Sequence, residues 1–253
     1  ASCRMGKRRT NNEDNFFLDG FFKPLEKADV PVACSARSEG GGVYAVCDGM
    51  GGQAYGERAA WMSAYGLSLF QKTLLEEKEP LESLVERCIS AINLSIVRQC
   101  EKHHCHMGST LALAVLLGST YHIFNLGDSR IYLYSGGTLT QLSKDHTETQ
   151  SLVDMGILSG RDPSIKDGAL VQYLGIPAEE MILKPHTATG TLQPEDRLLL
   201  CSDGLTDMLS DNKIALLLSQ SGSPEELAAR LTHAAEKAGG KDNVTALVIS
   251  LDA

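Results

Sequence analysis

The chain has 253 residues, of which 43% are hydrophobic, so one large core is possible and we expect a single domain over residues 1–253. Its formal net charge is −9, which disfavours nucleic acid and anionic membranes as partners. The longest apolar run, residues 111–117, is too short to span a bilayer, and no signal peptide is visible. We therefore expect no membrane insertion.

The first half of the chain predicts strands followed by two long helices. The expected strands lie at residues 15–18 and 42–47, separated by an aperiodic loop at residues 20–42. Helices are expected at residues 54–77 and 81–100, the second from the helical spacing of its apolar residues.

The second half predicts mostly short strands separated by glycine-rich turns. A meander of antiparallel strands is expected at residues 109–117, 120–126, 130–135 and 138–141. A helix at residues 147–155 leads into a polar segment, and the region near residues 147–170 is expected to contain a mobile flap at residues 156–168. The later strands are expected at residues 182–188, 197–201 and 244–251, and the later helices at 211–220 and 223–238.

This order of elements favours one fold class. Two long helices followed by a run of strands do not suit a doubly wound parallel sheet. Two antiparallel sheets, each covered by helices, suit the order better, so we predict an α+β fold.

The seven cysteines are unevenly spaced, and two of them indicate the compartment. Cys47 and Cys201 lie inside apolar runs, as buried free thiols do. This usage fits a reducing environment, and we expect a cytoplasmic protein.

Five short acidic clusters lie far apart in the chain, and most of them adjoin an apolar run that is typical of a strand. Carboxylates brought together by several strand ends repel one another strongly in a low dielectric. Hard divalent cations relieve that repulsion and prefer oxygen ligands. The sequence therefore predicts a multi-metal oxygen site, the apparatus for attack on a phosphoryl group. The clusters occupy residues 12–14, 48–52, 127–130, 202–204 and 241–244.

Together with residues 9–11 and 107–110, these clusters occur in the order seen in the metal-dependent protein phosphatases, the PPM or type 2C family. The chain resembles this family from Arg9 to Val248, and Met50 resembles the bacterial branch. The resemblance implies a four-layer α-β-β-α sandwich with the metals in a cleft at one end. It also implies hydrolysis of phosphoserine and phosphothreonine in proteins, in which a water that bridges two Mn²⁺ or Mg²⁺ ions attacks phosphorus.

The resemblance also assigns roles to three of the carboxylates and one glycine. It implies that Asp48 bridges both metals, that the Gly49 carbonyl binds the second metal, and that Asp203 and Asp242 ligate the first. Structural alternatives exist for each residue. Asp48 could belong to a plain Asp-Gly turn, Asp203 could cap a helix, and Asp242 could be a turn residue.

The remaining acidic residues are assigned weaker contacts. Glu13 and Asp14 are implied to act mainly through metal-bound waters, with a solvated strand edge as the alternative. Asp128 is implied to hold a third, weaker ion together with Asp203, with a hairpin-turn residue as the alternative. Asn243 is expected to orient Asp242 or a metal-bound water.

Arg9 is the expected ligand of the substrate phosphate, because the family places an arginine five residues before the position of Asp14. A guanidinium matches two phosphate oxygens with its fork. Arg9 and Asp48 are therefore the expected catalytic residues, and Arg8 reads as a surface residue. Met50 stands where animal-type members carry the histidine proposed as the general acid, and it cannot donate a proton. The proton would then come from a metal-bound water or from another residue, such as His146, although a structural anchor for the flap fits His146 better.

Two other patterns have weaker support. Cys3 and Arg9 form the Cys-x5-Arg spacing of cysteine-dependent tyrosine phosphatases, but no buried strand of sufficient length precedes Cys3. The cysteines and histidines of residues 100–106 resemble a loose zinc cluster, although a solvated helix end explains them better. A catalytically weak regulatory domain of the same fold would need lost ligands, and none is lost.

The resemblance finally implies partners. We expect phosphorylated proteins as substrates, among them a eukaryotic-type Ser/Thr kinase that the enzyme opposes. We also expect a monomer.

Overall fold

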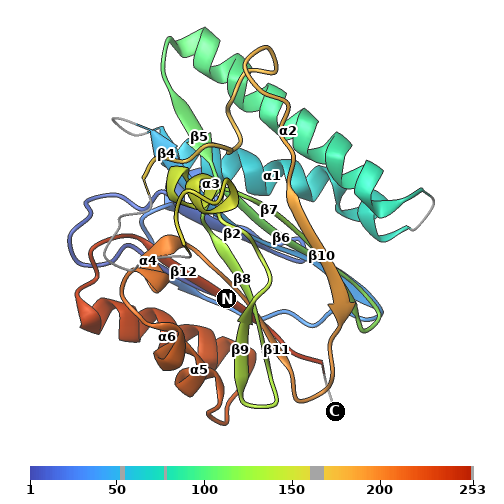
Figure 1. The fold of residues 1–253 in the computed structure, drawn as a ribbon, viewed down its shortest axis with the longest axis vertical. Coiled ribbons are helices and arrows are strands. Elements are labelled where there is room, and N and C mark those ends of the chain that lie inside the picture. Colours follow the sequence, from blue (N-terminus) through green and yellow to red (C-terminus); the bar gives the residue numbers. More distant parts are fainter. Residues whose placement is uncertain (52–54, 77–78, 160–167, 252–253) are drawn as a thin grey trace.

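The molecule is built around two antiparallel sheets, as Figure 1 shows for this computed structural model, which describes residues 1–51, 55–76, 79–159 and 168–251. The first sheet has the strand order β3-β1-β12-β11-β8-β9. Its strands are β1 (Ser2–Arg4), β3 (Val32–Ala33), β8 (Arg130–Ser135), β9 (Thr138–Gln141), β11 (Arg197–Cys201) and β12 (Val244–Ile249).

The second sheet has the order β10-β7-β6-β4-β2, and β5 pairs with the far end of β4. Its strands are β2 (Asp14–Leu18), β4 (Gly41–Gly51), β5 (Met107–Ser109), β6 (Leu111–Leu117), β7 (Thr120–Leu126) and β10 (His186–Thr191).

Helices cover the outer face of each sheet. In Figure 1, α1 and α2 lie over the second sheet, and α5 and α6 lie over the first. The helices are α1 (Gly56–Leu75), α2 (Leu81–His103), α3 (Glu148–Asp154), α4 (Asp203–Thr206), α5 (Asp211–Leu218) and α6 (Pro224–Ala238), with a 3-10 turn, η1, at Leu25–Lys27. No helix in the described residues is long and apolar enough to cross a bilayer.

Strand alternation divides the core into three layers. Phe16 packs between the two sheets, whereas its neighbour Phe17 packs under α1 and α2. In β11, Leu198 and Leu200 face the other sheet while Leu199 faces α5 and α6. This period of two buries both faces of each sheet, which is what a four-layer sandwich requires. The predicted α+β, α-β-β-α architecture is confirmed.

Several boundaries differ from the predictions. The strands β1, β3 and β5 were not predicted, because two- and three-residue strands carry no periodicity. The strand predicted at residues 182–188 lies instead at His186–Thr191. The predicted run at residues 109–117 is broken at Thr110, so that β5 and β6 pair with different parts of β4.

The predicted meander is wrong in one respect. β7 and β8 are consecutive, yet they belong to different sheets and do not pair. The chain therefore crosses from one sheet to the other at residues 127–129, so Asp128 is not in a hairpin turn.

Most of the predicted flap, residues 160–167, lies outside the described residues; α3 precedes it as predicted.

Candidate metal centre

The topology brings the acidic clusters to one end of the sandwich. β11 ends just before Asp203, and β12 begins just after Asp242. Because these strands are antiparallel neighbours, with Cys201 opposite Ala246, both aspartates come to the same edge of the first sheet. β2 of the second sheet begins at Asp14, which lies directly opposite Asp48 of β4.

Asp14 and Asp48 form the most constrained pair of the site. Directly opposed residues of antiparallel strands project from the same face, about 5 Å apart at Cβ, so these carboxylates are close neighbours. Asp14 is buried, and its Oδ2 accepts hydrogen bonds from Ser202 Oγ and Thr245 Oγ1, each at 2.7 Å. Its Oδ1 is also buried and has no hydrogen-bond partner among the described residues. A buried, unpaired carboxylate oxygen fits a site that receives a cation.

The electrostatics show how closely the carboxylates are grouped. Burial raises the pKa of Asp14 to about 6. Burial also raises the pKa of Asp48 well above its usual range, and the charges of Asp14, Asp203, Asp128 and Asp242 raise it further. The pKa of Asp203 is raised in the same way, first by burial and then by Asp128 and Asp242. Such mutual repulsion is what divalent cations with oxygen ligands relieve.

The carboxylates nevertheless stand apart as they lie. Within the described ranges, no three side chains of Asp, Glu, His or Cys form a ready-made cage for an ion. One reason is visible at the rim, where the Asp242 carboxylate is turned to a guanidinium: Arg9 Nη2 lies 2.6 Å from Asp242 Oδ2. Repulsion between like charges also favours separated carboxylates.

The backbone of Asp48 is held by Thr110. Its backbone N–H donates to Thr110 Oγ1 at 2.9 Å, and its carbonyl accepts from the Thr110 N–H at 2.8 Å. The Thr110 hydroxyl is itself 2.7 Å from Ser129 Oγ. Thr110 therefore fixes the backbone at Asp48.

The strand expected at residues 42–47 is longer than predicted, and the alternative of a plain Asp-Gly turn at Asp48 is wrong. β4 continues through Asp48 to Gly51, because β5 supplies a second partner strand there. Gly49 is required for a different reason, since a Cβ at this position would lie 2.0 Å from the Gly56 carbonyl oxygen. The glycine allows the start of α1 to approach the strand that carries Asp48.

Arg9 lies at the edge of the site and spans two of its acids. Besides its contact with Asp242, its Nη1 lies 3.8 Å from Glu13 Oε2. The hydrogen bond to Asp242 is the main cause of the raised pKa of Arg9. The guanidinium is partly exposed, so an anion that enters the site can reach it. Among the described residues Arg8 has no such acidic partner, and its side chain is exposed.

Asn243 holds the Asp242 carboxylate through its backbone, and its side chain has other partners. Its side chain does not orient the Asp242 carboxylate; its backbone N–H does, by donating to Asp242 Oδ1 at 2.8 Å. The side-chain Oδ1 accepts from the Glu13 N–H at 2.9 Å, and Nδ2 donates to the Met5 and Asn11 carbonyls. Asn243 therefore fixes the segment that carries Arg9 and Glu13 against the start of β12.

The residues around Asp128 and Asp203 correct two of the structural alternatives. Asp128 lies in the crossing between the sheets rather than in a hairpin. Ser202 is the N-cap of α4, and Asp203 is the first residue of that helix, so Asp203 does not cap it. Gly204 lets this helix touch β12, because a Cβ there would lie 1.8 Å from the Asn243 carbonyl oxygen.

His146 acts as an anchor between segments. The ring Nδ1 of His146 accepts from the Gly127 backbone N–H at 3.2 Å, and the backbone N–H of His146 donates to the Gly127 carbonyl at 2.9 Å. Its carbonyl accepts from the Val171 N–H at 2.9 Å. Burial lowers the pKa of the imidazole, with a further contribution from His186, so the ring is neutral at physiological pH. These contacts support the anchor interpretation over the proton donor.

Cys3 is unsuited to act as a nucleophile. It lies in β1 with no exposed surface, and burial raises its pKa, which keeps it a thiol. Arg9, its expected partner, is engaged with Asp242 instead.

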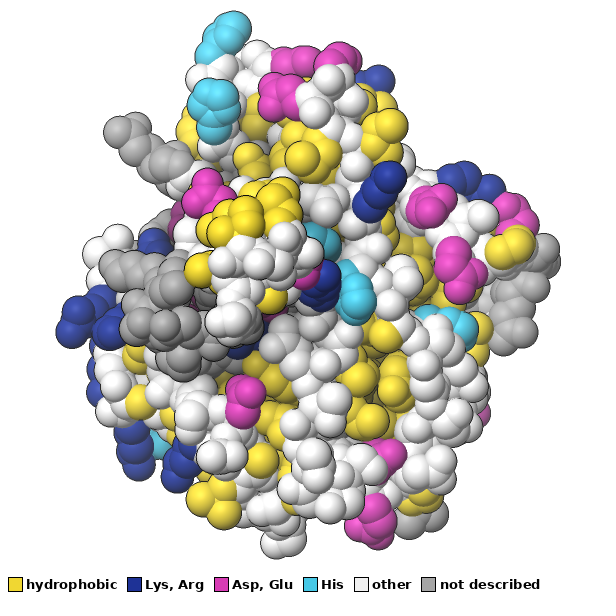
Figure 2. Space-filling view, in the orientation of Figure 1, with side chains coloured by type: hydrophobic (Ala, Val, Ile, Leu, Met, Phe, Trp, Pro, Cys, Tyr) yellow, Lys and Arg dark blue, Asp and Glu magenta, His cyan; other side chains and the backbone are white. Residues whose placement is uncertain are grey.

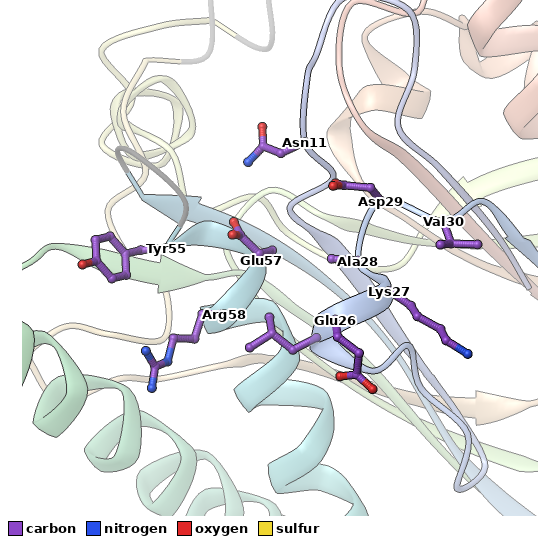
Figure 3. A pocket seen from close by; sticks show the side chains of 10 residues that line it. Asn11, Glu26, Lys27, Ala28, Asp29, Val30, Tyr55, Glu57 and Arg58 are labelled. Atoms are coloured by element: carbon purple, nitrogen blue, oxygen red, sulfur yellow. The ribbon is translucent and has the colours of Figure 1, made fainter.

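A small pocket adjoins the site on the side of η1 and α1. It has a volume of about 290 Å³ and is drawn in Figure 3, where Asn11, Asp29 and Glu57 border one part of it and Arg58 points away. The charge of Glu57 contributes to raising the pKa of Glu13, although burial is the larger cause. The negative charge of Glu57, which lines the pocket, therefore acts on the acidic site through Glu13.

Sequence reasoning missed Ser202 and Thr245, whose hydroxyls hold Asp14. Ser202 directly precedes Asp203, and Thr245 is a polar residue in an otherwise apolar strand. A polar residue within a buried strand was the available signal, because it must find a hydrogen-bond partner.

Comparisons with known proteins show which proteins this chain is similar to. The family model described as protein phosphatase 2C matches residues 32–247. The serine/threonine phosphatase stp of Listeria monocytogenes is 32% identical over 98% of this chain and 93% of its own length. The serine/threonine protein phosphatase PstP of Mycobacterium tuberculosis is 34% identical over 98% of this chain, which corresponds to 44% of that protein.

Solved structures show the same architecture. The crystal structure of M. tuberculosis PstP superposes with a TM-score of 0.79 at 31% identity, covering 100% of this chain and 98% of that one. A structure of the PstP catalytic domain in complex with two manganese ions gives a TM-score of 0.74 at 31% identity, covering 100% of this chain and 97% of that one.

Proposed function

Because this chain belongs to the protein phosphatase 2C family and is a serine/threonine protein phosphatase, we propose that its acidic site is a two-metal centre that hydrolyses phosphoserine and phosphothreonine. The observation that carries the proposal is the pairing of Asp14 with Asp48 across β2 and β4. One oxygen of Asp14 is held by two hydroxyls, and the other is buried without a partner.

The donor set suits hard divalent cations. Asp48, Asp203 and Asp242 would hold the ions directly, with the Gly49 carbonyl, and Glu13 and Asp14 would act through water. Oxygen-only donors favour Mn²⁺ or Mg²⁺ over Zn²⁺. When bound, such ions supply Lewis acidity and activate water as a nucleophile. The manganese ions of the related PstP structure support two ions here, and Asp128 with Asp203 is our proposed site for a third.

Arg9 would bind the substrate phosphate. Its guanidinium now pairs with Asp242 and Glu13, and it would exchange these partners for phosphoryl oxygens when substrate enters. This exchange also frees the Asp242 carboxylate to face a cation. The positive charge of Arg9 therefore pairs with Asp242 and Glu13 before substrate binds and with the phosphoryl oxygens afterwards.

The two side chains first considered as proton donors are unsuited to that role. Met50 cannot donate a proton, and the Nδ1 of His146 is occupied by the Gly127 N–H. We propose that the leaving group takes its proton from solvent at the open side of the site, where Asp48, Asp203 and Asp242 are only partly buried.

The physiological setting is also a proposal. Phosphoproteins are the substrate class, and a eukaryotic-type Ser/Thr kinase is the partner that such an enzyme would oppose. All seven cysteines are free thiols, which supports a reducing, cytoplasmic compartment. We propose a single catalytic domain that acts as a monomer.

Phosphate release from a phosphothreonine peptide tests the proposal directly. We expect release with Mn²⁺, none with EDTA, and recovery when Mn²⁺ is added back. The alternative of a catalytically weak regulatory domain would show little release under any metal condition. Equal release from a phosphotyrosine peptide would contradict the substrate class.

A further inference from the structure

The C-terminus of α2 brings two cysteine side chains together. His104 adopts the left-handed conformation, with φ 50° and ψ 44°, and ends the helix. The Cys105 N–H donates to the Cys100 carbonyl at 3.1 Å, and the His104 N–H reaches the Glu101 carbonyl at 3.4 Å. This pair of bonds defines a Schellman motif, which is frequently accompanied by a side-chain contact between the two positions that Cys100 and Cys105 occupy. The two thiols are hydrogen-bonded neighbours here.

The two thiols accordingly affect each other. Burial is the main cause of the raised pKa of Cys100, and the neighbouring Cys105 raises it further. The Cys100 thiol also donates to the Met107 carbonyl at 3.5 Å. Both cysteines are partly exposed, unlike Cys3, Cys47, Cys88 and Cys201, which are buried.

A small oxidant can reach both sulfurs. They line a groove of about 700 Å³ together with Met50, Gly51 and His106. Figure 2 shows histidine side chains gathered on the surface where α2 ends. Nearby imidazoles, when protonated, favour a thiolate, which is the reactive form of cysteine.

We propose that Cys100 and Cys105 form a redox-active pair, which hydrogen peroxide converts to a disulfide across the end of α2. The Cys105 thiolate attacks one peroxide oxygen, the O–O bond breaks, and the products are a Cys105 sulfenic acid and hydroxide. The sulfur of Cys100 then attacks the sulfenic sulfur, the S–O bond breaks, and water leaves with the proton of the thiol. The two thiols lose two electrons in all, and the peroxide becomes two waters.

The order of attack follows from the environments of the two sulfurs. Cys100 is the partly buried thiol with the raised pKa, so it stays protonated at neutral pH and acts second. A cellular thiol such as glutathione would reverse the reaction by thiol–disulfide exchange.

The disulfide would also change the groove beside the metal centre, and this step rests on the proposed function. Bond formation removes the thiol proton that Cys100 donates to Met107, the first residue of β5. Met107 pairs with Gly51, three residues beyond Asp48. A peptide substrate that lies in this groove would be affected, whereas a small phosphate ester at the metal centre would not.

Peptide mapping tests the pair independently of activity. Trypsin cleaves after Arg98 and Lys102, so Cys100 and Cys105 fall into separate peptides, residues 99–102 and 103–130. After treatment with dilute hydrogen peroxide, we expect these two peptides to be joined and to separate again with dithiothreitol. Cys105→Ser should abolish the cross-link, and Cys34→Ser, which removes the other partly exposed thiol, should retain it. Free Cys100 and Cys105 after treatment, or separate sulfonic acids at both, would overturn the proposal.

Kinetics of the oxidised enzyme test the effect on the groove. We expect KM for a phosphothreonine peptide to rise about threefold, with no change for p-nitrophenyl phosphate, because only the longer substrate contacts the groove. A cross-link with unchanged KM for the peptide would overturn the role of the groove. A protein that hydrolyses neither substrate even in the reduced form would instead contradict the proposed function.

Discussion

Arg9 Nη2 and Asp242 Oδ2 lie 2.6 Å apart, so the residue expected to bind phosphate and one of the residues expected to bind metal are each other's partners. The pair joins two segments that are 233 positions apart in the sequence. It neutralises one carboxylate at the rim of a site where several carboxylates repel one another. Substrate phosphate and metal would therefore have to enter by separating the same pair.

The first prediction concerns this arginine. Arg9→Ala should cost about 2–3 kcal/mol in kcat/KM for a phosphopeptide, the scale of a charge-assisted hydrogen bond, and mostly in KM. Affinity for Mn²⁺ should not fall, because the substitution releases Asp242. Steady-state kinetics and a Mn²⁺ titration measure both quantities. Arg8→Ala is the matched control, and equal effects of the two substitutions, or a large loss of Mn²⁺ binding in Arg9→Ala, would contradict the assignment.

The second prediction concerns the metal ligands. Asp203→Asn and Asp242→Asn should each lower kcat at least about a hundredfold at ordinary Mn²⁺ concentrations, while the metal-free fold keeps or gains stability. The gain is expected for Asp203→Asn, because it removes a repelling charge, whereas Asp242→Asn also loses the ion pair with Arg9 and should leave stability about unchanged. Activity and thermal unfolding in EDTA measure the two effects, and Glu195→Gln, at an exposed position, is the control. Near-normal turnover in both variants would show that the ligands lie elsewhere.

The third prediction concerns the hydroxyls that hold Asp14. Ser202→Ala and Thr245→Val each remove a 2.7 Å hydrogen bond to a buried carboxylate, and each should destabilise the protein by about 1–3 kcal/mol. Chemical denaturation measures the free energy of unfolding. Combining either substitution with Asp14→Asn should show strong non-additivity, since the same interaction is removed twice. Additive effects would mean that the hydroxyls stabilise the fold by some other contact.

The fourth prediction concerns pH. The pKa values of Asp14, Asp48 and Asp203 are raised in the folded protein, Asp14 to about 6. The folded state thus binds these protons more tightly than the unfolded state, so stability is gained as pH falls through the folded pKa and lost as pH rises through it. In EDTA, we expect the melting temperature to be several degrees higher at about pH 5.5 than at about pH 8.

Saturating Mn²⁺ should reduce or reverse this difference, because the ions require deprotonated carboxylates. Asp14→Asn should also weaken it in EDTA. A metal-free protein that is more stable at the higher pH would contradict the raised pKa values.

The sequence was sufficient to predict the fold because its signals are long or repeated. The apolar run at residues 197–201 and the helical period of residues 81–100 correspond to elements of the structure, with small changes at the ends. The strands that escaped prediction have two or three residues and exist only through their partners, as β5 exists through β4. The chain crosses between the sheets at Asp128 because β8 pairs in the first sheet, and no local sequence pattern indicates in which sheet a strand will pair.

The site was predictable to a similar extent. The acidic residues could be recognised because they are charged residues beside apolar runs. The antiparallel pairing of β11 with β12 explains why Asp203 and Asp242 lie at the same edge of the first sheet. The partners of those acids could not be predicted, because they depend on distances between segments. The Arg9–Asp242 ion pair and the contacts of Asn243 with Glu13 both join residues from opposite ends of the chain.

Asp14 belongs to one sheet, whereas the hydroxyls of Ser202 and Thr245 that hold it come from the other. Sliding of one layer over the other, a shear motion of the kind common between packed elements, would break both hydrogen bonds at once. The apolar side chains between the sheets, such as Leu200 and Ile123, oppose that sliding because they interdigitate. Loosening the packing of these apolar side chains would therefore misalign the carboxylates without altering any residue that touches a substrate. The packing between the two sheets thus determines the spacing of the carboxylates.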